Sequence, residues 1–209
     1  MFLAVTLAAM LHECAPNVSP ATMTAIVRVE SGGNTLALHD NSLNRSFAPS
    51  DTREAVAWTN QLIALGHSVD IGLSQVNNAN LPRLGLSVSQ AFDPCTNLRA
   101  GGTILGEDYR SASHEFGPGQ YALRRALGAY NTGSIFAGQG YVNEILEAAG
   151  LAPEEPVVPA VASAPAAPAA GAPAHSKKKS GIPGTTPVQG PAYSVQHTAG
   201  SPVVVLVGN

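Results

Sequence analysis

Apolar side chains recur at helical spacing through the first 150 residues, and capping signals separate the apolar segments. Ser19 can cap a helix, Pro20 suits its first position, and Gly32-Gly33 can end it. We therefore predict a helix over residues 20–31. The same reasoning predicts further helices, which begin at Asp51 (with Glu54), at Ser87 (with Gln90) and at Asp93-Pro94, or cover residues 121–130 and 141–149.

Strand signals are weak by comparison. Period-two alternation of apolar and polar residues is scarce, and no dipeptide typical of a tight hairpin stands between two apolar runs. Residues 34–50 and 66–80 are rich in Asn, Ser and Gly, which is typical of loops that reach across a cleft. The sequence thus predicts a mainly α domain in which any sheet is minor.

The two ends of the chain differ from this middle part. Residues 1–11 are apolar, but they lack the basic region of a secretory signal, and they are too few to cross a bilayer. We therefore expect a first, mostly buried helix and no membrane span. Both Cys, the single Trp and every Phe precede Gly150. Beyond Gly150 the chain is rich in Ala and Pro, which predicts one domain over residues 1–150 and a disordered tail over residues 151–209.

Charge and cysteine content narrow the function. The formal net charge is −3 and the first 150 residues contain no basic cluster, so we exclude nucleic acid as a partner. Cys14 and Cys95 have neither the spacing nor the nearby His of a metal site, and no metal or cofactor is expected. A disulfide between them is one interpretation, and two buried thiols in a reducing compartment is the other.

One carboxylate stands where a charge is unusual. In the predicted helix 20–31, Glu30 shares a face with Met23, Ile26 and Val27, at spacings of seven, four and three residues. Burial and the negative end of the helix dipole both raise the pKa of such a side chain, and a protonated carboxyl group is what a general acid needs. The alternative is a structural Glu at the edge of the core, paired with an Arg such as Arg28 or Arg124.

Three motifs in order resemble those of the soluble lytic transglycosylases, a family related in fold to goose-type lysozyme. They are Glu30-Ser31, Gly72-Leu73-Ser74-Gln75-Val76-Asn77 and Ala129-Tyr130-Asn131. The segments 80–85 and 92–98 are similar to the branch that accompanies type IV secretion and conjugation machines, which also carries a Cys near its start. The resemblance covers residues 1 to about 150.

The resemblance implies a lysozyme-like fold and cleavage of peptidoglycan between N-acetylmuramic acid and N-acetylglucosamine. Glu30 would be the single catalytic acid and base, and a 1,6-anhydro end would form without water. Ser31 would donate a hydrogen bond near Glu30 or to the sugar, and Gln75 and Asn77 would contact the glycan. The expected site also includes Asn131, Tyr130 with its phenol near Glu30, and Tyr141 as a similar candidate. Asp70 is expected to cap a turn, with electrostatic help to catalysis as the alternative.

Other functions remain open from the sequence. A hydrolytic muramidase on the same fold would use water in place of the C6 hydroxyl. A non-catalytic component could hold glycan while the tail recruits secretion or conjugation proteins. In the tail, the interpretations of Lys177-Lys178-Lys179 are solubility or contact with acidic wall polymers or lipid, and those of the apolar run 203–207 are a frayed end or a strand added to a partner. The substrate and the cysteines imply a periplasmic location, although no clear export signal precedes the domain.

Overall fold

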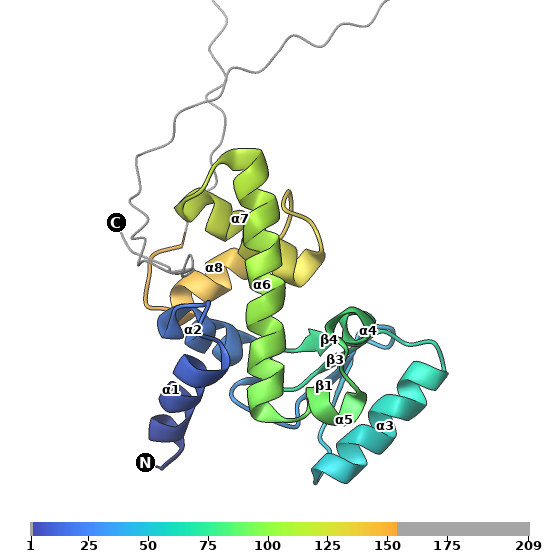
Figure 1. Ribbon diagram of the computed structural model, residues 1–209. Helices are drawn as coiled ribbons and strands as arrows, with labels where there is room; N and C mark the ends of the chain where they lie inside the picture. Colours follow the sequence, from blue (N-terminus) through green and yellow to red (C-terminus); the bar gives the residue numbers. More distant parts are fainter. Residues whose placement is uncertain (1, 154–209) are drawn as a thin grey trace, which may run out of the picture. The chain divides into compact units, whose positions relative to one another are not determined.

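The computed structural model describes residues 2–153, with the side chains of residues 2–6 and 8 left aside, and it is mainly helical (Figure 1). Apart from residues 151–153, the predicted disordered tail lies outside the described residues. The three lysines and the run 203–207 are in this undescribed part. The helices are α1 (Phe2–Cys14), α2 (Pro20–Ser31), α3 (Thr52–Ala64), η1 (Asn78–Asn80), α4 (Leu81–Leu84), α5 (Val88–Ala91), α6 (Pro94–Phe116), α7 (Gln120–Thr132) and α8 (Gln139–Ala148).

Local capping chemistry explains why the predicted helices agree well with those observed. The Ser19 hydroxyl accepts from the amide of Ala21, and Gly32 ends α2 in a left-handed conformation. Ser87 and Gln90 form the reciprocal capping box that the sequence predicts. The carboxylate of Asp51 accepts from the amide of Glu54 at the start of α3. These boundaries depend on neighbouring residues, so they can be read before the tertiary structure is known.

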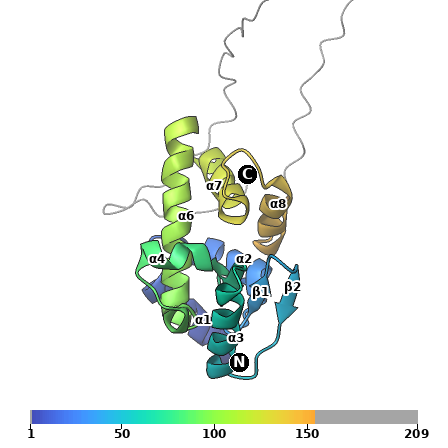
Figure 2. The same cartoon turned by 90° about the vertical axis from the view of Figure 1, so that its right-hand side faces the viewer.

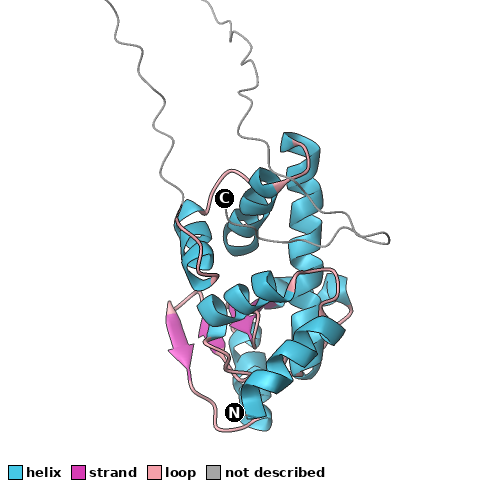
Figure 3. Cartoon of the chain, turned by 90° about the vertical axis from the view of Figure 1, so that its left-hand side faces the viewer, coloured by secondary structure: helices cyan, strands magenta, loops and turns pink. Residues whose placement is uncertain are grey.

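A small antiparallel sheet occupies the segments that we predicted as loops. Its strands are β1 (Leu38–Asp40), β2 (Arg45–Phe47), β3 (Val69–Ile71) and β4 (Val76–Asn77), in the order β2-β1-β3-β4 (Figures 2 and 3). Leu38 pairs with both Phe47 and Ile71. The prediction of a minor sheet is confirmed, but the assignment of residues 34–50 and 66–80 wholly to loops is wrong. Strands of two or three residues are too short to show an alternating pattern.

Helix α6 lies between α1, α2 and α8 on one side and the sheet with α3 to α5 on the other (Figure 1), and it contributes residues to two hydrophobic cores. Its residues Leu98 and Leu105 pack in a core formed mainly by α1, α2, α7 and α8. Ala100 and Ile104 belong to a second core, which contains the buried side chains of the sheet and of α3 to α5. Tyr130 packs against both cores. The seam between the two cores is therefore where side chains from both can meet.

The first helix is attached to α6 by a covalent bond. Cys14, at the end of α1, forms a disulfide with Cys95, at the start of α6, which confirms the disulfide interpretation over two free thiols. The expectation that α1 is mostly buried fails for the side chains that are described. Of the side chains described within residues 1–11, Leu11 is buried, Leu7 and Met10 are half-buried, and Ala9 is exposed. Helix α1 therefore packs along one edge on the domain surface.

Candidate active site

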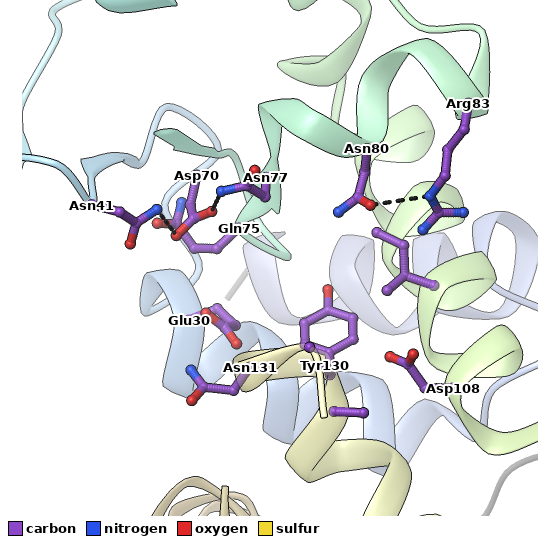
Figure 4. A pocket seen from close by; sticks show the side chains of 13 residues that line it. Glu30, Asn41, Asp70, Gln75, Asn77, Asn80, Arg83, Asp108, Tyr130 and Asn131 are labelled. Atoms are coloured by element: carbon purple, nitrogen blue, oxygen red, sulfur yellow. Dashed lines mark hydrogen bonds between the residues drawn. The ribbon is translucent and has the colours of Figure 1, made fainter. Parts of the chain in front are cut away.

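A polar cleft of about 340 Å³ lies along the seam between the two cores (Figure 4). It brings together side chains from both sides of the domain, although they are far apart in sequence. The lining residues are Glu30, Asn41, Asp70, Gln75, Asn77, Asn80, Arg83, Ile104, Asp108, Ala129, Tyr130, Asn131 and Gly133. The cleft thus includes five of the predicted site residues: Glu30, Gln75, Asn77, Tyr130 and Asn131.

Glu30 reaches the cleft from the last turn of α2. That helix buries Met23, Ile26 and Val27 in the core, so the carboxyl group leaves the same face at the point where the core opens into the cleft. The predicted orientation of Glu30 is therefore correct. A pairing with Arg28 is not seen, because the Arg28 guanidinium donates to the backbone carbonyl of Ala148 over 3.2 Å.

The environment of Glu30 favours the protonated carboxyl group. Burial, helped by the negative charges of Asp70 and Glu144, raises the pKa of Glu30 from 4.5 to about 7. A hydrogen bond from Tyr141 acts in the opposite direction, because it stabilises the carboxylate. About half of the molecules would therefore hold this proton at neutral pH, which is the range in which a general acid operates well.

The two tyrosines have different roles from those expected. The hydroxyl of Tyr141, from α8, donates to Oε1 of Glu30 over 2.5 Å. The hydroxyl of Tyr130 instead donates to the backbone carbonyl of Ser74 over 2.7 Å, so the expected contact between Tyr130 and Glu30 is wrong. Tyr130 keeps its place in the cleft lining between the two ends of the site. Tyr141 is not among the residues that line the cleft, and it is only 8% exposed.

Asp70 faces the cleft from the opposite side, on β3. Its two carboxylate oxygens accept hydrogen bonds from the side-chain amides of Asn41, over 2.8 Å, and Asn77, over 2.7 Å. Figure 4 shows this group of three above Glu30. The expectation that Asp70 caps a turn is therefore wrong. Asp70, on β3, instead binds Asn77 of β4 and Asn41, which follows β1, and its charge contributes to the raised pKa of Glu30.

Gln75 lies in the cleft in a left-handed backbone conformation, with φ of 46°. Such a conformation costs a non-glycine residue on the order of 1 kcal/mol and is more frequent at functional sites. Its side-chain amide donates to the carbonyls of Gly72 and Ala37. The side-chain carbonyl oxygen of Gln75 can accept a hydrogen bond from a ligand.

Ser31 has a structural position. Its hydroxyl is 2.8 Å from the carbonyl of Leu73 and 3.1 Å from that of Val27, and it accepts from the amide of Gly33. The expected hydrogen bond from Ser31 to Glu30 or to a sugar is therefore replaced by contacts to backbone. Through Leu73, Ser31 connects the end of α2 to the second motif, and it does not line the cleft.

A buried asparagine fixes the turn that carries the second motif. Asn97, on α6, accepts from the amide of Ser74 and donates to the carbonyls of Ile71 and Ala91, at 2.7 to 2.8 Å. Gly72 approaches this amide so closely that an added Cβ would lie 2.5 Å from Asn97 Nδ2. With φ of 75° as well, position 72 accepts glycine far better than any other residue.

Comparison with known proteins agrees with this geometry. The family model described as "Transglycosylase SLT domain" matches residues 9–143. The chain belongs to the SLT transglycosylase family. The match contains all three motifs and the cleft that they line, and it confirms the resemblance predicted from the sequence.

Proteins similar to this chain are named virB1, and one of the two names below refers to a type IV secretion system. "Protein virB1" of Agrobacterium fabrum is 38% identical over 140 residues, which are 66% of this chain and 57% of that protein. "Type IV secretion system protein virB1" of Brucella abortus biovar 1 is 37% identical over 155 residues, 70% of this chain and 65% of that protein. The chain thus spans between 57% and 65% of the length of these relatives. No solved structure gives a significant match.

Several residues of the SLT cleft were not predicted as site residues. Asn41, Asn80, Arg83, Ile104 and Asp108 all line it. Of these, Asp108 carried a usable signal, because it follows Ile104 by four residues and Leu105 by three and so shares a helix face with core residues, just as Glu30 does. Asn41 and Asn80 stand in polar segments whose position depends on tertiary packing.

Two further properties concern residues 2–153. In this part of the chain, no three His, Cys, Asp or Glu side chains gather where they could hold a metal ion. The helices described here also include none that is both long enough and apolar enough to cross a membrane.

Proposed function

We propose that this SLT domain is a peptidoglycan lytic transglycosylase with Glu30 as its catalytic acid and base. The observation that carries the proposal is a carboxyl group with a pKa of about 7 in a polar cleft. Cleaving a glycosidic bond requires a proton on the leaving oxygen, and Glu30 can supply it near neutral pH. Membership of the transglycosylase family favours this reaction over other acid-catalysed reactions.

The first step would be acid catalysis. Glu30 donates its proton to the oxygen that joins C1 of N-acetylmuramic acid to N-acetylglucosamine, and the C1–O bond breaks. The departing sugar takes the proton and a positive, oxocarbenium-like charge develops at C1. Tyr141 supports this step, because its hydrogen bond stabilises the carboxylate that Glu30 leaves behind.

The second step would use the same carboxylate as a base. Glu30 takes the proton from the C6 hydroxyl of the muramic acid while that oxygen bonds to C1, so a 1,6-anhydro ring forms and Glu30 regains its proton. No water is consumed. Since the nucleophile belongs to the substrate, a second catalytic carboxylate is not required. Asp70 lies across the cleft and can stabilise the positive charge at C1 electrostatically.

The remaining cleft residues would hold the glycan. The carbonyl oxygens of Gln75 and Asn131 can accept from sugar hydroxyls or N-acetyl groups, and the Tyr130 ring can pack against a sugar face. Asn77 contributes mainly by holding Asp70. In this proposal, Gln75, Asn131 and Tyr130 bind the glycan, and Glu30 transfers the protons.

The names of the relatives support a role in opening the wall locally for a type IV secretion or conjugation apparatus. That role places the enzyme in the periplasm, which agrees with a disulfide between Cys14 and Cys95. The tail would contact proteins of the apparatus. We propose no nucleic acid partner.

The decisive experiment is digestion of purified peptidoglycan, followed by mass spectrometry of the released muropeptides. The parent protein is compared with Glu30→Gln and with Glu115→Gln, an exposed change on α6 outside the cleft. We expect anhydro products, each one water lighter than a hydrolysis product, from the parent and from Glu115→Gln but not from Glu30→Gln. Reducing ends would indicate a muramidase. No product from the folded, disulfide-bonded parent would contradict an enzymatic role and favour a binding or assembly function.

A further inference from the structure

Of the three carboxylates in the cleft, Asp108 alone has no role in the mechanism above. Asp108 lines the cleft from α6, and Figure 4 shows it on the other side of Tyr130 from Glu30. Its Oδ2 atom is buried and has no hydrogen-bond partner within the part of the chain that the structure describes. Buried carboxylate oxygens are normally paired, so an unpaired one in a cleft is unusual.

The charged groups around Asp108 do not supply the missing hydrogen-bond partner. The nearby Arg83 guanidinium forms an ion pair with Glu107 and also donates to Asn80 over 3.1 Å. Burial, with a further contribution from Glu107, raises the pKa of Asp108 from 3.8 to about 6, and Arg83 lowers it only in part. Asp108 is therefore held at a cost to the folded state, since its charge is poorly solvated and its partner is missing.

From this geometry we propose that Asp108 binds a hydrogen-bond donor of peptidoglycan at the end of the cleft away from Glu30. The inference rests on the proposed function and extends it, because it assigns a second binding position to the same cleft. A carboxylate in this place accepts O–H and N–H groups. Asn80 and Arg83 line the same end of the cleft, so a polar unit of the substrate would meet several matching groups there.

Two parts of peptidoglycan offer such donors. The sugars carry hydroxyl and N-acetyl N–H groups, and the peptide stems carry amide N–H and ammonium groups. Both use the same chemistry at Asp108. A glycan that lacks peptide stems separates the two sources.

The test uses the full chain with Glu30→Gln, so that bound glycan is not cleaved. Calorimetry at pH 7.5 compares this protein with versions that also carry Asp108→Asn or Glu115→Gln. The ligands are a chitin hexasaccharide, which has no peptide, and peptide-bearing glycan strands. We expect Asp108→Asn to weaken binding about 10-fold, as for a lost hydrogen bond to a charged group, and Glu115→Gln to leave it unchanged. Weaker binding of both ligands assigns a sugar donor, and weaker binding of the peptide-bearing strands alone assigns a stem donor.

A thermal melt provides a second readout that a structural role would not produce. Because Asp108→Asn removes a poorly solvated charge, its midpoint should rise at pH 7.5 while binding falls. Equal binding of both ligands by the Asp108→Asn and Glu115→Gln proteins would overturn the inference, and the proposed function would stand if the parent still releases anhydro products. Failure of the Glu30→Gln protein to bind the peptide-bearing strands would also overturn the inference, and the muropeptides released by the parent decide the proposed function separately.

Discussion

Glu30 and Asp70, on the two sides of the cleft, have opposite surroundings. On the helical side, Glu30 emerges from a helix whose neighbouring turns are buried, and a single hydroxyl, from Tyr141, contacts its Oε1. On the sheet side, Asp70 accepts one amide on each oxygen, from Asn41 and Asn77. The first environment favours a proton, and the second satisfies a negative charge.

In the proposed mechanism, position in the fold, and not residue type, separates the acid from its electrostatic partner. Apolar packing around α2 removes water from Glu30 and raises its pKa to about 7. The short strands bring amides to Asp70 that take the place of water. Each side also influences the other, because the charge of Asp70 is among the causes of the raised pKa of Glu30.

The largest expected effect comes from removing one carboxylate at a time. Glu30→Gln removes the proton donor and should lower kcat/KM on peptidoglycan at least about 1,000-fold, whereas Asp70→Asn removes only electrostatic support and should cost about 10- to 100-fold. Muropeptide release rates at pH 6 measure both. Equal losses would mean that the two sides do not divide the work in this way.

The disulfide should matter next, and mainly for the helical side. Cys14 and Cys95 are 81 residues apart, and closing a loop of that length contributes about 4 kcal/mol in the chain-entropy model. We expect Cys14→Ala with Cys95→Ala to lower the free energy of unfolding by roughly that amount in urea denaturation. A change below about 1 kcal/mol would contradict this estimate and show that the unfolded chain without the disulfide is already restricted by residual structure.

Asn97 provides the corresponding test on the sheet side. Asn97→Ala leaves the amide of Ser74 and the carbonyls of Ile71 and Ala91 without this partner, which should cost about 2 to 4 kcal/mol in the free energy of unfolding. Asn60→Ala, on the exposed face of α3, is the matched control and should stay within about 0.5 kcal/mol of the parent. Similar unfolding energies for the two variants would contradict the role of Asn97.

The same contrast explains what could be predicted from the sequence. The helical side follows local rules: Ser19, Pro20 and Gly32 define α2, and the spacing from Met23 places Glu30 on the buried face. The three motifs predicted the family and five residues of the cleft. For these features, neighbouring residues contain the necessary information.

The remaining features depend on contacts between distant segments. The strands are too short and too polar to show a pattern, so Asp70 was expected to cap a turn. Whether Tyr130 or Tyr141 reaches Glu30 depends on how α7 and α8 pack against α2, and spacing along the chain cannot decide this. Asp108, in contrast, could have been predicted, because it lies three and four residues after core residues of α6, just as Glu30 does in α2.

The smallest expected effects are shifts of the pH profile. Since Glu30 must be protonated in the first step, kcat/KM should fall as the pH rises through its pKa of about 7. Asp70→Asn removes a negative charge that raises this pKa, so activity should be lost at lower pH. Tyr141→Phe removes the hydrogen bond that lowers it, so activity should persist to higher pH. Shifts in the same direction for both variants would contradict the assignment.

The most direct test of the central claim is the pKa of Glu30 itself. Carbon NMR of the protein labelled at the glutamate carboxyl carbon, with Glu30→Gln to assign the signal, follows this one group through a pH titration. The account predicts a midpoint near 7. A midpoint near 4.5, the ordinary value for glutamate, would show that Glu30 is ionised at neutral pH and would contradict its role as the acid.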